Sequence, residues 1–171
     1  DIQENSMAYE IYDSNKISQE FPFRVVDIGL NSILQRSNLD LLALMDQFGM
    51  LAESHELKKR IELTRKAFLK LWDPQNENFY SRDEISEQLI RVSTSACFLP
   101  LFGQLANDEQ AMKMISILEK WTEQEFFLVP STSPFDPKYE PQRYWRGPIW
   151  PHVNWMIYEG LKDYGHHNLS Q

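Results

Sequence analysis

The apolar residues of this chain recur at helical spacing, and this periodicity constrains its fold more than any other feature. Between positions 28 and 48 they stand three, four or seven residues apart, at Leu30, Leu34, Leu41, Leu44 or Met45, and Phe48. Residues with this spacing lie on one side of an α-helix. Asp27 stands where an N-cap is expected, and Gly49 stands where a helix commonly ends. The spacing therefore predicts a helix over 28–48.

Two more helices are predicted in the middle of the chain. Ser54 is expected to cap a helix that ends at residues 72–74, because proline disfavours the helical conformation in the residue before it. A polar segment follows, with one short extended stretch at 79–81. The next helix is expected over 94–105, interrupted or kinked at Pro100.

The last two helices have clear end signals. Asn107 opens one of them, with Gln110 three residues later in the position of a capping box. The other is expected to begin near Pro148, to run to Tyr164 and to stop at Gly165. The resulting pattern of helix pairs joined by loops predicts an all-α fold.

A long connection, 121–147, separates these two helices. Loops of more than roughly 12–15 residues in a compact domain are usually functional or disordered. This one is rich in aromatic residues, at Phe126, Phe127, Phe135, Tyr139, Tyr144 and Trp145. The aromatic content predicts a packed, functional loop.

Composition excludes several function classes. The net charge is −8 and no basic tract is present, which argues against nucleic acid. No apolar run approaches the roughly 20 residues that cross a bilayer, and residues 1–10 lack the features of a signal peptide. Cys97 is the single cysteine, so an internal disulfide and a cysteine-based zinc site are excluded, and a cytoplasmic location is expected. No other metal site or cofactor is expected.

The segment 144–155 is the strongest candidate for a binding site. It holds three of the five tryptophans. Flat indole faces stack on the apolar faces of sugar rings, while Arg146 or Asn154 can supply hydrogen bonds to hydroxyl groups. The alternative is a tryptophan-rich corner of the core with Arg146 in a structural ion pair.

The same segment carries a resemblance to a known family. The run YWRGPIWPHVNWMIYEGLKDYG resembles a motif in the last third of the catalytic domain of glycoside hydrolase family 63. FRVVDIGLNSILQRSNLDLLALMDQFG resembles an earlier helix of that domain, and FYSRDEISEQL with STSACFLPLFG resembles the intervening hairpin. PSTSPFDPKYEPQRYWRGPIW resembles the loop that leads into the sugar site. The likeness covers about residues 21–165 and is closest to bacterial members, which include hydrolases of mannosylglycerate and glucosylglycerate.

The resemblance implies a fold and a reaction. The family folds as an (α/α)6 barrel of six inner and six outer helices, so this chain is expected to form a single partial barrel domain over 1–171, with 121–147 as its substrate-side loop. The family hydrolyses glycosidic bonds with inversion, using two carboxylic acids about 6.5–9.5 Å apart. Neither of their motifs is found in this sequence, so the catalytic residues stay unknown.

Residues of the sugar site transfer by resemblance. Trp145 and Trp150 match aromatic walls of the family's substrate pocket, and Arg146 matches its hydrogen-bonding guanidinium. Tyr144 and Asn154 match the motif as supporting residues, and Asn154 has the alternative of tying a helix to a loop.

Two carboxylates of this chain are expected at the rim of a pocket. They are Asp27, at a helix start, and Asp136, in the long loop. Each has a simpler explanation, since Asp27 suits an N-cap and Asp136 precedes a proline in a typical turn sequence. His152 is interpreted as an ordinary loop histidine.

The expected function is therefore an inverting glycosidase for small α-linked glucosides or mannosides, or the sugar-binding portion of one. The alternatives are a non-catalytic helical fragment that binds sugar and a helical scaffold that binds protein. The expected partners are a small carbohydrate and either a second copy of this chain or the rest of the barrel. This last expectation follows because an incomplete barrel exposes an apolar patch larger than the few hundred Å2 that monomers usually tolerate.

Overall fold

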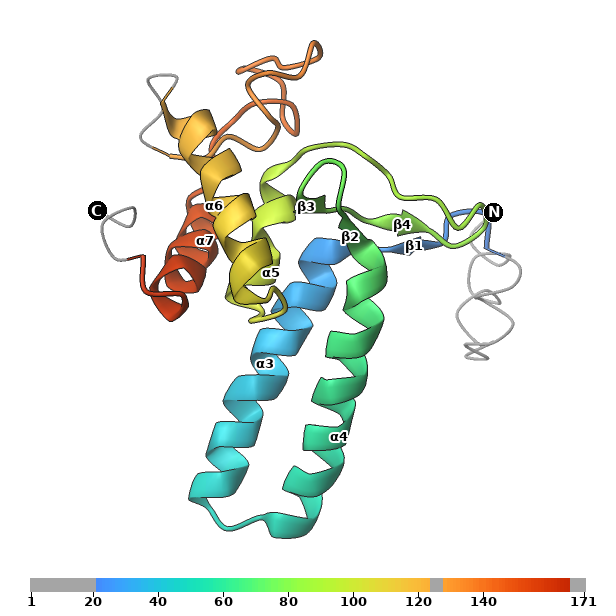
Figure 1. The fold of residues 1–171 in the computed structure, drawn as a ribbon, viewed down its shortest axis with the longest axis vertical. Helices are drawn as coiled ribbons and strands as arrows, with labels where there is room; N and C mark the ends of the chain where they lie inside the picture. Colours follow the sequence, from blue (N-terminus) through green and yellow to red (C-terminus); the bar gives the residue numbers. More distant parts are fainter. Residues whose placement is uncertain (1–20, 124–127, 167–171) are drawn as a thin grey trace, which may run out of the picture.

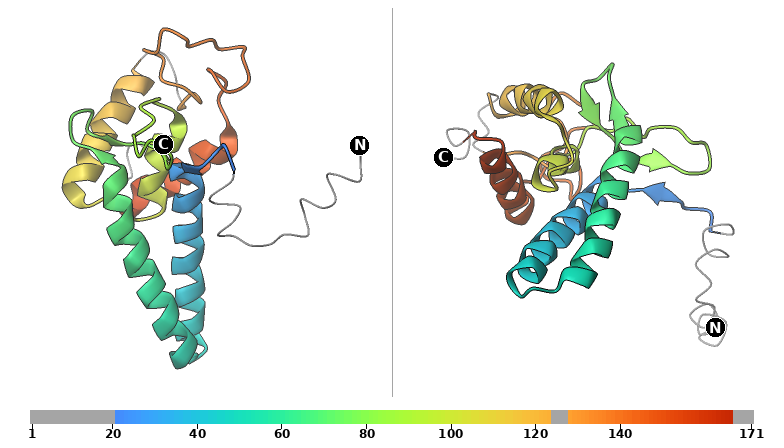
Figure 2. Two further views of the ribbon diagram at one scale, coloured as in Figure 1. Left: turned by 90° about the vertical axis from the view of Figure 1, so that its right-hand side faces the viewer. Right: turned by 60° about the horizontal axis from the view of Figure 1, so that its bottom comes forward.

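Two long antiparallel helices extend away from a head of shorter elements (Figure 1). The computed structural model describes residues 21–123 and 128–166. The long pair is α3 (Ile28–Gln47) and α4 (Leu51–Phe68), and the head contains α5 (Leu99–Phe102), α6 (Asp108–Thr122) and α7 (Pro151–Asp163). Figure 2 shows that the loop before α7 lies at the end of the molecule opposite the tip of the long hairpin.

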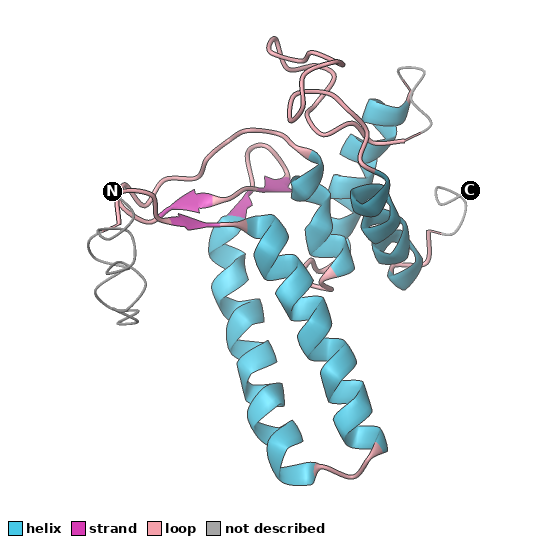
Figure 3. Cartoon of the chain, turned by 180° about the vertical axis from the view of Figure 1, so that it is seen from behind, coloured by secondary structure: helices cyan, strands magenta, loops and turns pink. Residues whose placement is uncertain are grey.

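The short strands of the described residues lie where the long hairpin meets the head (Figure 3). Strand β1 (Val25–Val26) pairs antiparallel with β4 (Arg82–Asp83), and β2 (Trp72–Asp73) pairs antiparallel with β3 (Asn78–Phe79). Of the extended stretch predicted at 79–81, only Phe79 lies in a strand. These pairs connect the end of α4 to the start of α3.

Helix α3 forms where the periodicity predicts it, but its predicted apolar side faces outward. Asp27 caps the helix, with Oδ1 accepting from the Leu30 backbone N at 2.7 Å. The buried residues of α3 are Ile28, Gly29, Ser32 and Gln35. The leucines of the predicted side are 44–71% exposed, and we call Leu30, Leu34, Leu41 and Leu44 the open face of α3. The period of a helix is local, whereas the side that becomes covered depends on its neighbours.

Helix α4 begins before Ser54, so the predicted cap is wrong. Gly49 adopts a φ of +71°, which glycine tolerates, and Met50 serves as the N-cap. Ser54 is buried in the first turn, where its Oγ donates to the Leu51 carbonyl at 3.1 Å. The buried apolar residues of this segment, Leu57, Ile61, Phe68 and Leu71, stand three, four or seven residues apart, as on one side of a helix.

The helix predicted over 94–105 is much shorter in the structure. A 3-10 turn, Ser95–Phe98, leads directly into α5. Pro100 lies in the first turn of α5, where the missing N–H is harmless, so it does not kink the helix. At Gly103, just after α5, a Cβ would lie 2.8 Å from the carbonyl oxygen of Ser32. This close approach packs the end of α5 against α3.

The predicted start of α6 is confirmed, and the predicted ends of α7 are partly so. Asn107 and Gln110 form both bonds of the capping box, at 2.8 and 3.0 Å. Helix α7 starts at Pro151 rather than near Pro148, and the chain turns out of it at Gly165, with a φ of +80°. Proline favours the first helical turn, but the sequence does not say which of two prolines three residues apart occupies it.

The core lies in the head and at the adjoining end of the long hairpin. Its largest fully buried apolar side chains are Phe79, Phe98, Leu101, Met114 and Ile115. At its edge, Arg36 of α3 donates from Nη1 to Asp163 of α7 at 2.8 Å and stacks over the ring of Phe102 at 4.9 Å. In the described part of the chain, no helix is both long enough and apolar enough to cross a membrane.

The buried carboxylate of Asp73 makes the fold sensitive to acid. Its oxygens accept from the Asn76 side chain at 2.8 Å, from Arg91 Nε at 2.6 Å and from the Gln75 backbone N at 3.0 Å. The hydrogen bond from Asn76, followed by that from Arg91, lowers the pKa of Asp73 from 3.8 to about 2. A depressed pKa stabilises the fold above the unfolded value, and this stability is lost as the pH falls through the folded value.

We therefore expect the free energy of unfolding to decline as the pH falls from about 4 to about 2. Asp73→Asn is expected to weaken this dependence and to cost about 1–3 kcal/mol at neutral pH, because an amide nitrogen in place of the buried Oδ2 accepts neither the hydrogen bond from Asn76 nor that from Arg91. Urea unfolding at a series of pH values measures both effects. An unchanged slope in the Asp73→Asn variant would contradict the assignment.

Candidate functional site

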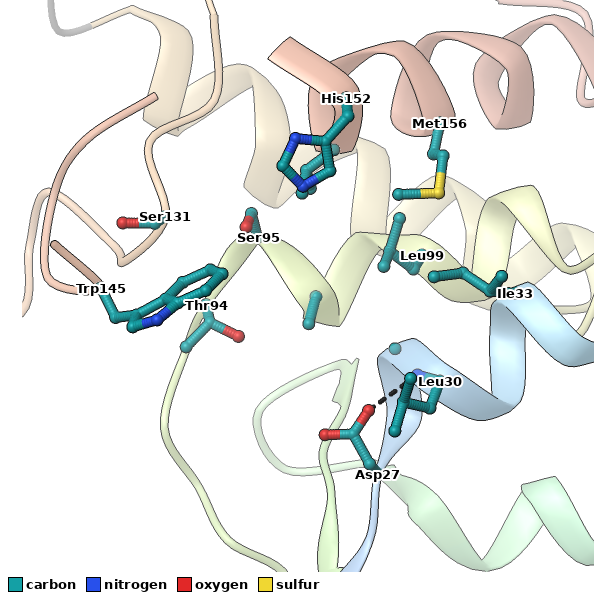
Figure 4. Close-up of a pocket in the computed structure, with 13 residues that line it drawn as sticks. Asp27, Leu30, Ile33, Thr94, Ser95, Leu99, Ser131, Trp145, His152 and Met156 are labelled. Carbon is teal, nitrogen blue, oxygen red and sulfur yellow. Dashed lines mark hydrogen bonds between the residues drawn. The ribbon is translucent and has the colours of Figure 1, made fainter. Parts of the chain in front are cut away.

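A cavity of about 440 Å3 opens where the start of α3, the segment 94–99, the start of α7 and the loop before α7 meet (Figure 4). Its thirteen lining residues are Asp27, Gly29, Leu30, Ile33, Thr94, Ser95, Ala96, Leu99, Ser131, Trp145, His152, Val153 and Met156. This volume is within the range that small-molecule sites occupy.

The cavity combines an apolar floor with a few polar groups at its edges. Asp27 and His152 lie on opposite walls, and the indole of Trp145 forms part of a third (Figure 4). Among the lining residues, Asp27 is the only carboxylate and His152 is the only group that can carry a positive charge. An apolar surface with a small number of fixed polar groups suits a compact polar ligand such as a sugar.

Three predicted aromatic residues cluster beside the cavity. The ring centroids of Tyr144 and Trp145 are 5.3 Å apart, and Trp150 lies 4.9 Å from Tyr144 and 5.2 Å from Trp145. Of the three, Trp145 lines the cavity. The Nε1 of Trp150 is buried and has no hydrogen-bond partner within the described residues. Trp150 therefore lies behind Trp145 and packs against its ring.

Asn154 holds the loop to α7. Its Oδ1 accepts from the Val129 backbone N at 2.7 Å, and its Nδ2 donates to the carbonyls of Val129 at 2.9 Å and Trp150 at 3.1 Å. The side chain is buried, and it does not line the cavity. Its contacts correspond to the alternative role considered from the sequence, a tie between helix and loop.

We expect Asn154→Ala to lower the free energy of unfolding by about 2 kcal/mol, because it leaves both polar backbone groups of Val129 buried and unpaired. Asn31→Ala is a matched control. The Asn31 side chain donates to the Asp27 carbonyl, which also accepts from the Asn31 backbone and so stays paired. Chemical unfolding of both variants makes the comparison, and equal losses would contradict the role of Asn154.

Besides Tyr144, Trp150 and Asn154, two further predicted site residues lie outside the cavity. Arg146 is exposed, and its backbone N and O take part in a turn with Arg143 and Glu140. Asp136 accepts from the Lys138 backbone N at 2.7 Å, as expected of a residue that begins a turn. The structure therefore brings Asp27 and Trp145 to one cavity and leaves Arg146 and Asp136 away from it.

Sequence reasoning missed most of the cavity lining, including several of its polar residues. His152, interpreted as an ordinary loop histidine, lies in the cavity wall, and so do Thr94 and Ser95. The position of His152 two residues after Trp150 was a usable signal. The other two reach the cavity because Thr94 pairs with Thr132, a contact between distant parts of the chain that no local pattern indicates.

Cys97 lies in the core close to the cavity, and its thiol is expected to be unreactive. It is 1% exposed, and burial raises the pKa of its thiol to about 11. The neutral thiol is therefore not poised as a nucleophile. Within residues 21–123 and 128–166, no group of three or more His, Cys, Asp and Glu side chains is placed to hold a metal ion.

Comparison with known proteins shows close relatives. The chain is 41% identical over 154 residues to a mannosylglycerate hydrolase from Thermus thermophilus, covering 90% of this chain and 37% of the relative. It is 39% identical over 160 residues to mannosylglycerate hydrolase MGH1 of Selaginella moellendorffii, covering 94% of this chain and 33% of the relative. The chain thus spans about a third of the length of these relatives.

A solved structure shows the same fold. The crystal structure of the family 63 mannosylglycerate hydrolase from Thermus thermophilus in complex with glucose matches with a TM-score of 0.87 and 39% identity, over 97% of this chain and 39% of that one. This match confirms the all-α fold of helical hairpins, part of a family 63 glycosidase barrel, that the resemblance implies. The family model for the mannosylglycerate hydrolase MGH1-like glycoside hydrolase domain covers residues 3–171. The chain therefore belongs to the mannosylglycerate hydrolase MGH1-like glycoside hydrolases.

Proposed function

We propose that this chain forms the sugar-binding part of an inverting hydrolase of small α-linked mannosides or glucosides. The proposal rests on one observation above all. The cavity brings an aromatic wall, Trp145, and a carboxylate, Asp27, to a single space of about 440 Å3. Mannosylglycerate is the first candidate substrate, because the relatives described above are mannosylglycerate hydrolases.

The residues have distinct proposed roles. Trp145 stacks on the sugar ring, and Trp150 backs it with its own ring 5.2 Å away. One oxygen of Asp27 is used by the helix cap, so the other is available to accept from a sugar hydroxyl. Tyr144 and Asn154 support the aromatic cluster and the loop.

Arg146 and Asp136 are proposed at the outer rim, on the substrate-side loop 121–147. A guanidinium there suits a substrate with an acid group, because it can pair with a carboxylate through two hydrogen bonds. Residues 124–127 of this loop, with Phe126 and Phe127, lie outside the described residues.

The chemical step needs carboxylic acids that this chain is not proposed to supply. Inverting hydrolysis uses a general acid that protonates the leaving oxygen and a general base that activates water. Asp27 accepts a hydrogen bond as the cap of α3, and Asp136 does not line the cavity, so the cavity holds no pair of carboxylates from this chain. We therefore propose that the chain binds the sugar, and that groups elsewhere in a complete barrel perform the hydrolysis.

Hydrolysis followed by NMR tests this division of roles. The purified chain is incubated with mannosylglycerate, glucosylglycerate, trehalose and kojibiose, and binding of each is measured by calorimetry. We expect binding of at least one glycoside without turnover. Release of an inverted sugar would place the reaction in this chain and overturn the division of roles. The absence of both binding and turnover would overturn the proposed sugar site.

The open face of α3 supports a proposal about partners. Its leucines are 44–71% exposed, and the chain spans about a third of the length of the relatives described above. We propose that this face is covered by further helices of a barrel when these are present. In the isolated chain, we expect two copies to associate through it.

The association predicts a clear mutational effect. The paired substitution Leu34→Glu and Leu44→Glu is expected to raise the dissociation constant of the self-associated chain at least about tenfold, since each buried leucine contributes about 1.5–3 kcal/mol. Met112→Glu, at a residue 55% exposed on α6, is the control. Sedimentation velocity gives the constant. A wild-type chain that stays monomeric at micromolar concentration would contradict the prediction.

A cytoplasmic location is also proposed. It is supported by Cys97, a lone and fully buried cysteine, since chains of oxidising compartments commonly use paired cysteines.

A further inference from the structure

Trp145 lies in a turn over residues 140–146, and a backbone hydrogen bond joins the two ends of this turn. The Glu140 backbone N donates to the Arg146 carbonyl at 2.8 Å, so the two ends of the turn are bonded together. At Gly147 a Cβ would lie 2.5 Å from the carbonyl oxygen of Glu140, which leaves no space for a side chain. The turn therefore moves as one unit, and the position of Trp145 depends on what fixes this unit to the rest of the molecule.

Two short side chains attach the turn to the body. The Oγ1 of Thr132 donates to the carbonyl of Trp145 at 2.8 Å. The Oγ of Ser131 accepts from the Gly147 backbone N at 3.0 Å. Thr132 and Ser131 are 5% and 3% exposed, so water competes weakly for either bond.

The attachment point is itself fixed to the cavity wall. Thr132 forms an antiparallel bridge with Thr94, and the carbonyl of Ser131 accepts from the Ser95 backbone N at 3.1 Å. Thr94 and Ser95 both line the cavity. A continuous chain of hydrogen bonds therefore runs from the cavity wall to the backbone of Trp145.

Packing against other side chains does not by itself fix the position of the Trp145 ring. Trp145 is 60% exposed, and its ring contacts are with Tyr144, which is 64% exposed, and with Trp150. A largely exposed ring loses less mobility through packing than a buried one, so the backbone hydrogen bonds decide where it points.

We propose that Thr132 is a positioning residue that holds Trp145 over the cavity. The hydroxyl acts through the Trp145 carbonyl and touches no ligand. This role deepens the proposed sugar site, and the effect of Thr132 on sugar affinity rests on that proposed function. The effect of Thr132 on the position of the Trp145 indole does not depend on that function.

A nearly isosteric substitution isolates the hydroxyl. Thr132→Val keeps the backbone bridge to Thr94 and the shape of the side chain, but it removes the donor. The Trp145 carbonyl that loses its partner is only partly buried, so the substitution does not leave a fully buried polar group unpaired. Thr132→Ser retains the donor and serves as the rescue variant.

The first measurement is 19F NMR of the chain labelled with 5-fluorotryptophan, with the Trp145 signal assigned from Trp145→Phe. We expect Thr132→Val to shift or broaden this signal, and Thr132→Ser to leave it close to wild type. Thr122→Val is the matched control, because the Thr122 hydroxyl donates to the Glu119 carbonyl at 2.9 Å, at the end of α6. The control is expected to leave the Trp145 signal unchanged.

The second measurement is calorimetric titration with mannosylglycerate. Thr132→Val is expected to weaken binding about five- to tenfold, which corresponds to the loss of one hydrogen bond, and Thr132→Ser less than about twofold. In a Trp145→Ala background, Thr132→Val is expected to have no further effect, because its influence passes through the indole.

The outcomes separate the two proposals. An unchanged Trp145 signal in Thr132→Val, or an equal loss of affinity in the Trp145→Ala background, would overturn the positioning role. A wild-type chain that binds no glycoside would overturn the sugar site, and the 19F signal alone would then decide the role of Thr132.

Discussion

Gly160→Ala is expected to lower the free energy of unfolding by about 2 kcal/mol, although alanine is the better helix former. A Cβ at this position of α7 would lie 2.6 Å from the Phe102 backbone N and 2.8 Å from the Leu101 carbonyl carbon. Both atoms belong to the backbone of α5, so no side-chain rotation relieves the contact. Overpacking of this kind costs about 3 kcal/mol, whereas the gain in helix propensity is about 1 kcal/mol, so the clash decides the sign.

Urea unfolding followed by circular dichroism measures this loss. Gly165→Ala is the matched control, because a Cβ there meets nothing within 4 Å and only the positive φ of +80° is strained. The control is expected to lose about 1 kcal/mol. If Gly160→Ala were no less stable than the wild type, then α5 and α7 would separate readily, and the head would be looser than the structure indicates.

The second large effect concerns ligand binding. Trp145→Ala is expected to weaken mannosylglycerate binding about thirtyfold or more, since removal of a central aromatic contact typically costs about 2 kcal/mol. The proposed stacking places the sugar against this indole, and no other aromatic ring lines the cavity except the imidazole of His152. Calorimetric titration at one temperature and salt concentration gives the affinity.

Trp155→Ala controls for the loss of an exposed indole. Trp155 is 58% exposed, close to the 60% of Trp145, but it packs on Phe102 with ring centroids 6.0 Å apart and lies outside the cavity. The control is expected to bind as the wild type does. Equal losses in the two variants would mean that the affinity does not depend on the cavity wall.

Local signals predicted the starts of α3 and α6 correctly, but they did not predict which side of a helix its neighbours cover. The capping box at Asn107 and the N-cap at Asp27 appear as expected, because both depend on residues three positions apart. The open face of α3 was predicted from the same kind of pattern, yet it is exposed. A periodic apolar stripe indicates that something covers it, but the covering element is not necessarily within the same stretch of chain.

The candidate site divides in the same way. Trp145 and the aromatic cluster are recognisable from one short segment, and their rings do lie together. Asp27 reaches the same cavity from more than a hundred residues away, and His152 completes it from the first turn of α7. Thr132, which fixes the turn, gave no signal in the sequence, because its role depends on a hydrogen bond that only the folded chain creates.

Asp27 has a consequence for how such a protein can change over evolution or by design. One carboxylate both starts α3 and faces the cavity. A nonpolar substitution that alters what the cavity accepts at this point also removes the helix cap, a loss of about 0.5–2 kcal/mol. Asparagine, serine and threonine preserve the cap, so they form the narrow set of replacements through which ligand preference can drift without a second, compensating mutation.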